Sequence, residues 1–269
     1  GEASNSKDLN LHLPDSYSYI PDFQSLQSAL SSKEIDYAKR TLKDLELISG
    51  VHSTQIGTAM SEILRTMDKV SLVNQKGFLI LIQILSLKIY DEKSKENSNE
   101  FLQFYITKDE QNYKELSGES LQNFIKRIKS IMDKASGNYR RILKEKELDF
   151  KNENHIKVLI SIVKQFQDYS FVKSYKTDLY QLIFYRFASQ FAKDSNAQFI
   201  TPLPIIDFLV NIINPRNGET VIDPTVGIAD FLSISYVNSN SKLDDNNIFG
   251  LDIDTQMVNL ATLNMLLNG

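Results

Sequence analysis

The chain has 269 residues, 42% of them hydrophobic, which is enough to bury one large core or two modest ones, and we expect two domains. Its 30 basic and 34 acidic residues leave a net charge of −4, so no global field draws the whole molecule onto nucleic acid or an anionic membrane. The absence of cysteine excludes disulfides, thiolate metal ligands and cysteine nucleophiles, and it fits a reducing cytoplasm.

Other classes are disfavoured by what the sequence lacks. Its three histidines, His12, His52 and His155, are scattered, so we expect no histidine metal cluster. No uninterrupted apolar stretch reaches the roughly 20 residues of a membrane helix, and no signal peptide is apparent. We therefore expect a soluble protein. Because the chain begins with Gly1 rather than methionine, we expect its natural start to lie elsewhere.

The N-terminal two thirds of the chain is predicted to be helical. Residues 1–21 show little periodicity and are expected to form an irregular arm. From 22 to 195 there is no proline, and apolar residues recur at helical spacing, which predicts a helical bundle. The segments with this spacing are EIDYAKRTLKDLELI, TQIGTAMSEILRTMDKV, KGFLILIQILSLKIYDEK, SLQNFIKRIKSIMDKA, NHIKVLISIVKQFQDYSF and DLYQLIFYRFASQFA, with breaks at Gly50, Gly118 and Gly137.

Two segments of this region stand out. KGFLILIQILSLKIYDEK (76–93) is apolar on nearly every side, so we expect it to be the central helix. The segment 126–146, KRIKSIMDKASGNYRRILKEK, concentrates cations that could touch phosphates. The acids Asp133, Glu145 and Glu147 are interleaved with or adjoin these cations and favour an ordinary solvated helix surface.

After residue 196 the pattern changes to alternating helices and strands. PLPIIDFLVNII predicts a helix, TVID a buried strand, DPTVGIA a loop and ADFLSISYVNS a helix; IFGLD then predicts a second strand and DTQMVNLATLNMLLNG a second helix. Strand, helix and strand in this order form a βαβ unit of a parallel sheet.

The ends of the two strands suggest a ligand site. Parallel sheets bind ligands at the carboxyl ends of their strands, where Asp223 is expected. Gly227 allows a close approach to the main chain. Asp252, 25 residues further on, could accept two hydrogen bonds from a ribose diol. A glycine loop with a distal acid predicts an adenosine-bearing ligand.

Three stretches, in order, carry a family resemblance: QFITPLPIIDFLVNIINP, VIDPTVGIADFL and IFGLDIDTQMVNLATLNMLLNG. They resemble the opening motifs of N6-adenine DNA methyltransferases, the modification subunits of type I restriction-modification systems. The resemblance implies a mainly α N-terminal helical bundle, followed by the first part of an α/β Rossmann-like methyltransferase domain that uses S-adenosylmethionine. It is specific over about 70 residues and looser before them.

The resemblance also implies roles for individual residues. Phe199, Ile200, Thr201 and Pro202 would flank the methionine end of S-adenosylmethionine, and Asp223, Pro224, Thr225 and Gly227 would surround its amino-acid moiety. Asp252 would hold the ribose hydroxyls, and Ile253 would lie against the adenine. We interpret Asp254 as the N-cap of the last helix.

The sequence departs from the family pattern in two places. Ala229 stands where the family has its second loop glycine, followed by Asp230, which we expect to cap the next helix. No Asn-Pro-Pro-aromatic motif, which would hold the flipped adenine, occurs in the 269 residues. We therefore identify no catalytic residue and no metal ligand, and we expect the chain alone to be inactive. The rest of the sheet is expected to be missing, disordered or supplied by another chain.

The resemblance implies DNA and a DNA-specificity subunit as partners, and it leaves open a restriction subunit and association into a homo-oligomer. The alternative is a non-catalytic helical interaction module with a degenerate nucleotide-binding fold. A dinucleotide-binding dehydrogenase is disfavoured because a G-x-G-x-x-G loop is absent.

Overall fold

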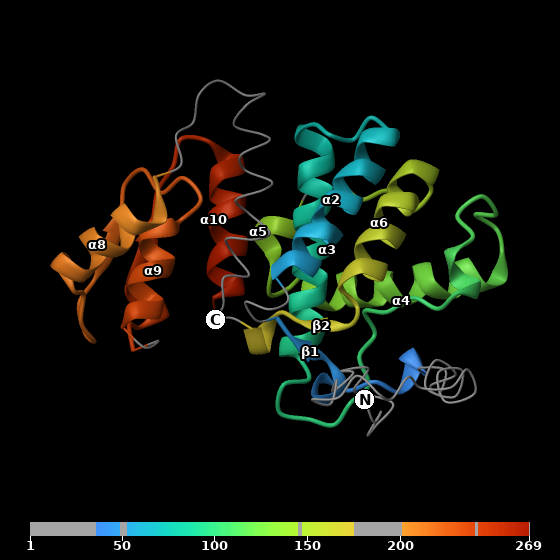
Figure 1. Ribbon diagram of the computed structural model, residues 1–269, viewed down its shortest axis with the longest axis horizontal. Coiled ribbons are helices and arrows are strands. Elements are labelled where there is room, and N and C mark those ends of the chain that lie inside the picture. Colours follow the sequence, from blue (N-terminus) through green and yellow to red (C-terminus); the bar gives the residue numbers. More distant parts are fainter. Residues whose placement is uncertain (1–35, 49–52, 145–146, 175–200, 240–241, 269) are drawn as a thin grey trace, which may run out of the picture. The chain divides into compact units, whose positions relative to one another are not determined.

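The computed structural model describes residues 36–48, 53–144, 147–174, 201–239 and 242–268 (Figure 1). Its first part contains the helices α2 (Ser53–Lys69), α3 (Gln75–Lys93), α4 (Glu119–Ala135), α5 (Arg140–Leu143) and α6 (Glu153–Phe166), the strands β1 (Glu46–Leu47) and β2 (Tyr169–Ser170), and the short 3-10 helices η1 (Tyr37–Lys39), η2 (Leu42–Asp44), η4 (Asp109–Gln111) and η5 (Val172–Ser174). Within the described ranges, no helix combines the length and the apolar character that crossing a bilayer requires.

Several predictions fall outside these ranges. They are the irregular arm at 1–21, the break at Gly50, the helix DLYQLIFYRFASQFA, the domain boundary at 195/196, and the site residues Phe199 and Ile200.

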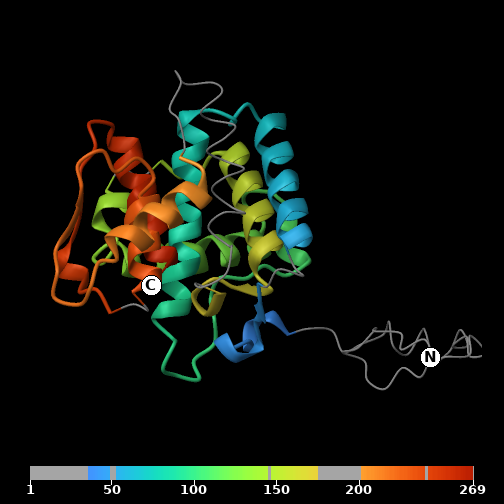
Figure 2. The same ribbon diagram turned by 60° about the vertical axis from the view of Figure 1, so that its left-hand side comes forward.

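Four of the predicted helices are confirmed as α2, α3, α4 and α6. In α4 the buried residues recur at helical spacing and form one apolar stripe, while the other face is polar. Figures 1 and 2 both show α2, α3 and α6 side by side. Their apolar faces meet in one core, which includes Ile63, Ile84 and Ile162.

The prediction of a helix over EIDYAKRTLKDLELI was wrong. Its described part forms η1, η2 and the strand β1. The Asp44 carboxylate accepts hydrogen bonds from the backbone N–H and the hydroxyl of Thr41, a local arrangement that competes with the α-helix. β1 then pairs in parallel with β2, Glu46 opposite Tyr169, and this distant partner overrides the local periodicity.

The central position predicted for 76–93 is confirmed, because α3 contacts α4, α5 and α6. Its N-cap is Asn74, whose side chain accepts a hydrogen bond from the Gly77 N–H at 3.0 Å. A Cβ at Gly77 would lie 1.8 Å from the Leu72 carbonyl oxygen, so only glycine allows this close approach.

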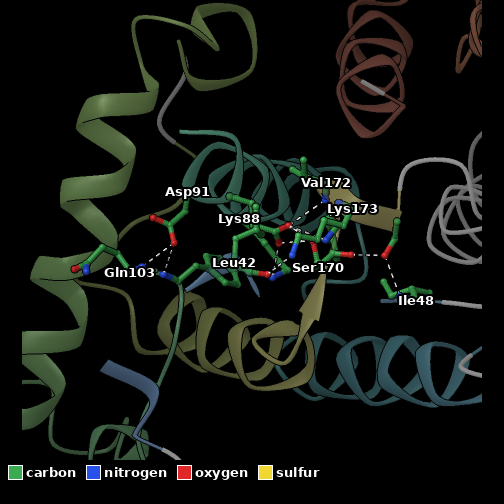
Figure 3. Close-up of polar contacts among 12 residues, drawn as sticks. Leu42, Ile48, Lys88, Asp91, Gln103, Ser170, Val172 and Lys173 are labelled. Atoms are coloured by element: carbon green, nitrogen blue, oxygen red, sulfur yellow. Dashed lines mark hydrogen bonds and ion pairs between the residues drawn. The ribbon is translucent and has the colours of Figure 1, made fainter. Parts of the chain in front are cut away.

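The polar end of α3 is nevertheless buried. The Lys88 ammonium and the Glu92 carboxylate are 2.8 Å apart, with the two residues only 1% exposed. The Lys88 Nζ atom lies over the rings of Phe104 and Phe171, at 5.4 and 5.1 Å from their centroids. Figure 3 shows Lys88 directed toward the chain around Ser170.

Glu92 also binds the segment that follows β2. Its carboxylate accepts hydrogen bonds from the Ser170 hydroxyl and from the backbone N–H groups of Phe171 and Val172, at about 2.9 to 3.0 Å. This segment in turn holds β1, because the Ser174 hydroxyl accepts the Ile48 N–H at 2.9 Å (Figure 3). One buried carboxylate therefore joins α3, β2 and β1.

Asp91, at the position before Glu92 in α3, binds a second segment. One of its oxygens accepts the backbone N–H groups of Gln103 and Phe104, at 2.7 and 2.9 Å (Figure 3). The other oxygen pairs with Lys95. The sequence predicted an apolar core helix here, and the structure adds two anchoring carboxylates to it.

The second part of the fold contains α8 (Leu203–Ile213), β3 (Val221–Asp223), α9 (Asp230–Asn238), η7 (Asp245–Asn247), β4 (Ile248–Gly250) and α10 (Thr255–Leu267). The order and types agree with the prediction, and β3 and β4 pair in parallel with Ile222 opposite Phe249. The C-cap of α8 is Asn214, which adopts the left-handed conformation common at helix C-termini.

α10 contributes to two hydrophobic clusters. Leu260 and Leu263 belong to the same core as the helices of the first part, whereas Ala261 packs with Val226 and Leu232 of the βαβ unit. The face of the β3–β4 pair that carries Ile222 and Phe249 is exposed.

We predict that Glu92→Gln destabilises the protein by about 3–5 kcal/mol, because it leaves the Lys88 charge buried without a partner. The measurement is the free energy of unfolding from urea denaturation. The control is Glu62→Gln, since Glu62 pairs with Arg65 across i,i+3 on the exposed surface of α2. This control should change stability by less than about 1 kcal/mol, and equal effects would contradict the structural role of Glu92.

A pH dependence is expected from His155. Its buried ring accepts the Asp149 N–H on Nδ1 at 3.0 Å, which requires the neutral form. Burial, followed by the charge of Lys76, lowers the pKa of His155 below its usual 6.5, against the smaller opposing effects of Asp149 and Glu147. Because the unfolded chain then binds the proton more tightly, the stability from His155 is present above pH 6.5 and is lost as the pH falls below it.

Urea denaturation at pH ~7 and pH ~5 should show this loss in the wild type and a smaller loss in His155→Gln, which keeps an acceptor but does not titrate. An equal loss in both proteins would exclude His155 as its source.

Candidate functional site

The loops that follow β3 and β4 are joined by three hydrogen bonds. The Leu251 N–H donates to the Asp223 carbonyl at 2.9 Å, and the Val226 N–H donates to the Leu251 carbonyl at 2.7 Å. The Gly227 N–H then donates to Oδ2 of Asp252 at 2.9 Å. The parallel pairing of the strands thus continues into their carboxyl-end loops, where sequence analysis placed the site.

Asp252 lies two residues beyond the end of β4 and is half-buried. Its Oδ1 accepts the Asp254 N–H at 2.9 Å, while Oδ2 accepts the Gly227 N–H. A carboxylate has about four acceptor positions. Two of them are used to shape the loops, so Asp252 keeps acceptor capacity for a ligand hydroxyl.

The glycine loop contains two residues in the left-handed conformation. Gly227 has φ +51°, and Ala229 has φ +64° although it carries a side chain. The conformation that a glycine would favour is therefore retained at Ala229. A Cβ at Gly227 would meet nothing within 4 Å, so the main chain there is open to an approaching group.

The expected capping role of Asp230 is corrected by the structure. Ala229 occupies the N-cap position of α9, and Asp230 is the first residue of the helix. Asp230 is buried, and its charge lies in the first turn, where the helix dipole favours an acid.

Asp254 occupies the N-cap position of α10, because its carbonyl accepts the Val258 N–H. Capping of that helix by its side chain stays a prediction.

Asn264 holds the glycine loop by a hydrogen bond from α10 and was not predicted from the sequence. This fully buried residue of α10 donates from Nδ2 to the Ile228 carbonyl at 2.6 Å. Asn268 donates in turn to the Asn264 side chain at 2.8 Å. The available signal was two amides at i,i+4 spacing in the otherwise apolar stretch LNMLLNG.

The remaining predicted residues differ in their surroundings. Asp223 is half-buried and accepts the Thr225 N–H on Oδ1 at 3.0 Å, whereas Pro224 and Thr225 are exposed. Ile253 is fully exposed. Thr201 and Pro202 lie at the start of α8, where Pro202 takes the N-cap position. The hydrogen bonds thus bring together Asp223, Thr225, Gly227 and Asp252.

The two loops are acidic. Residues 223–230 and 251–255 contain Asp223, Asp230, Asp252 and Asp254 and no lysine or arginine. Such a site disfavours a phosphate group and favours a ligand that carries positive charge.

Comparisons with known proteins find matches in the region that contains these two loops. Residues 173–269, which include both loops, match the family model described as N-6 DNA Methylase. The chain is 26% identical over 122 residues to the Type I restriction enzyme EcoEI methylase subunit of Escherichia coli, an alignment that covers 42% of this chain and 25% of the relative.

A second relative is the Type I restriction enzyme MjaVII methylase subunit of Methanocaldococcus jannaschii. It is 28% identical over 127 residues, which cover 45% of this chain and 22% of the relative. The chain thus spans about a quarter of the length of these curated relatives. These matches agree with the family resemblance predicted from the sequence: residues 173–269 are similar to the N-6 DNA methylases, and part of the chain is similar to type I restriction enzyme methylase subunits.

Proposed function

We propose that this chain is the N-terminal part of the modification subunit of a type I restriction-modification system, which transfers a methyl group from S-adenosylmethionine to N6 of adenine in DNA. The observation that carries the proposal is the hydrogen bond from the Gly227 N–H to Asp252, which joins the glycine loop to the distal acid at the strand ends. The family match and the names of the relatives support the same activity.

The residues present fit the cofactor. The open main chain at Gly227 can receive its amino-acid moiety, and the free acceptor positions of Asp252 can receive its ribose hydroxyls. Ile253, which is exposed, can lie against the adenine. Phe199, Ile200, Thr201 and Pro202 are proposed to flank the methionine end, with Asp223, Pro224 and Thr225 around the loop.

The charge of the loops separates this cofactor from a dinucleotide. A pyrophosphate at the strand ends would lie near the carboxylates of Asp223 and Asp252, and the two loops contain no lysine or arginine to neutralise it, whereas a sulfonium and an ammonium group are attracted by these carboxylates. Within a Rossmann-like domain, this edge of the sheet is therefore proposed to select a cationic nucleoside over a phosphorylated one.

The chemistry asks little of acid–base groups. When bound, S-adenosylmethionine supplies an electrophilic methyl on its sulfonium. The residues of this chain bind and orient the cofactor, and positioning accounts for much of the rate. The adenine-holding Asn-Pro-Pro-aromatic motif is not among the 269 residues, so we propose that the chain alone binds the cofactor without transferring its methyl group.

The proposed organisation is an N-terminal arm at 1–21, a helical domain at 22–195 and the cofactor-binding start of the methyltransferase domain at 196–269. DNA and a separate specificity subunit are the proposed partners, with a restriction subunit in the full system. The family match disfavours the alternative of an interaction module without a cofactor.

We predict that Asp252→Asn lowers the affinity for S-adenosylmethionine by about 10-fold or more, because hydrogen bonds to a charged acceptor contribute roughly 1.5–3 kcal/mol. Isothermal titration of the chain measures this. The control is Asp245→Asn, which removes an exposed carboxylate of η7 and should leave the affinity unchanged. Absence of binding by the wild type, or equal affinity of both variants, would overturn the proposal.

A second prediction concerns Ala229. We expect Ala229→Gly to change the cofactor affinity by less than about 3-fold, because Ala229 already adopts the left-handed conformation that the loop needs. Relief of that conformation, about 1–2 kcal/mol, is offset by the lost methyl burial and the greater entropy of the unfolded chain. Titration calorimetry measures the cofactor affinity, and thermal unfolding measures the stability. If the Ala229→Gly variant bound the cofactor 10-fold more tightly, Ala229 would be shown to impair the site.

A further inference from the structure

Positive charge is concentrated on one part of the surface although the whole chain carries −4. Between residues 126 and 144 there are seven lysines and arginines and a single acid, Asp133. Six of these cations are exposed, and we call them the cationic face: Lys126, Lys129, Lys134, Arg140, Arg141 and Lys144. The residues outside this segment are therefore net acidic.

The cationic face follows two neighbouring elements. Lys126, Lys129 and Lys134 line one surface hollow along α4, which also contains one acid, Asp133. α5, which carries Arg140 and Arg141, packs against α4. The sequence periodicity explains this placement, because the apolar stripe of α4 is buried and its cations are left on the other side.

The seventh cation, Arg127, lies in the same helix but is neutralised by a carboxylate within the structure. Its guanidinium forms two hydrogen bonds to the Glu110 carboxylate, at 2.8 and 2.9 Å, and lies 3.8 Å from the centroid of the Tyr105 ring. In contrast, no carboxylate of the described residues lies within 4 Å of any cation of the cationic face. Within the described residues the six cations therefore have no neutralising carboxylate, although the Lys129 Nζ atom lies 5.0 Å from the centroid of the Phe150 ring.

We propose that the cationic face binds the phosphate backbone of duplex DNA. The choice of DNA as the polyanion rests on the proposed function, whereas the excess of positive charge does not. Lys126 and Lys134 are separated by about 12 Å along α4, and duplex DNA carries one charge per roughly 1.7 Å of its axis. The hollow therefore spans several phosphates.

The type of side chain indicates the mode of binding. Lysine ammonium groups are point charges, so the contacts of α4 would position the duplex without reading its sequence. The acids Asp133, Glu145 and Glu147 favoured an ordinary solvated surface in the sequence analysis. Glu145 and Glu147 lie beyond Lys144, however, and only Asp133 lies within the cationic face. The helical part would thus hold the DNA while bases are read elsewhere.

The test replaces Lys126, Lys129 and Lys134 together by glutamine in the full chain. Fluorescence anisotropy with a short labelled duplex is expected to show an affinity reduced by about 10-fold or more at roughly 50 mM salt. The plot of log affinity against log salt concentration should become shallower by about 2 to 3, since each lost phosphate contact removes about 0.9 from the slope.

The control replaces three exposed lysines of other elements, Lys69, Lys108 and Lys164, and should bind the duplex as the wild type does. An unchanged affinity of the first variant, an equal loss in the control, or binding of anionic vesicles in place of the duplex would overturn the proposal. Cofactor titration of the same variant separates the two ideas, because S-adenosylmethionine affinity should not change. If the wild type did not bind S-adenosylmethionine, the cofactor site would be rejected, but the DNA-binding result would still hold.

Discussion

The Glu92 carboxylate is the constraint on which the first part of the structure depends. It lies in the core of the protein, at the polar end of the central helix α3, and neutralises a lysine that is equally buried. The same carboxylate accepts hydrogen bonds from the backbone N–H groups of Phe171 and Val172, which would otherwise be buried without acceptors. Charge pairing and backbone satisfaction thus coincide in one side chain. The family match begins at Lys173, so the segment fixed by Glu92 leads directly into it.

The long helices could be predicted from the sequence because their determinant is local. The apolar stripe of α4 and the apolar surface of α3 are written in consecutive residues, and periodicity finds them. The segment 34–48 could not be predicted in this way. Its periodicity is helical, yet Ile48 is bound to Ser174, 126 residues later, and β1 exists only because β2 lies beside it. The burial of the Lys88–Glu92 pair could not be predicted either, since charged residues at i,i+4 on a helix usually lie in water.

The site residues, too, were predictable where residue type and spacing determine them and unpredictable where a distant partner does. The turn at Gly227 and the acid at Asp252 were predicted from residue type and spacing, and the structure joins them by a hydrogen bond. Asn264 was missed because its partner is the carbonyl of Ile228, and a carbonyl has no signature in sequence. The left-handed conformation of Ala229 was also unpredictable, because the surrounding loop imposes it against the preference of alanine.

The uncovered side of the β3–β4 pair has a practical consequence for work with this chain. Ile222 and Phe249 lie side by side there, and α8 exposes Phe208, Ile212 and Ile213. Exposed apolar side chains of this kind promote self-association, which strengthens with protein concentration and is not relieved by salt. Purified material should therefore be kept dilute, and a charged side chain in place of Phe208 would improve its solubility without touching the glycine loop.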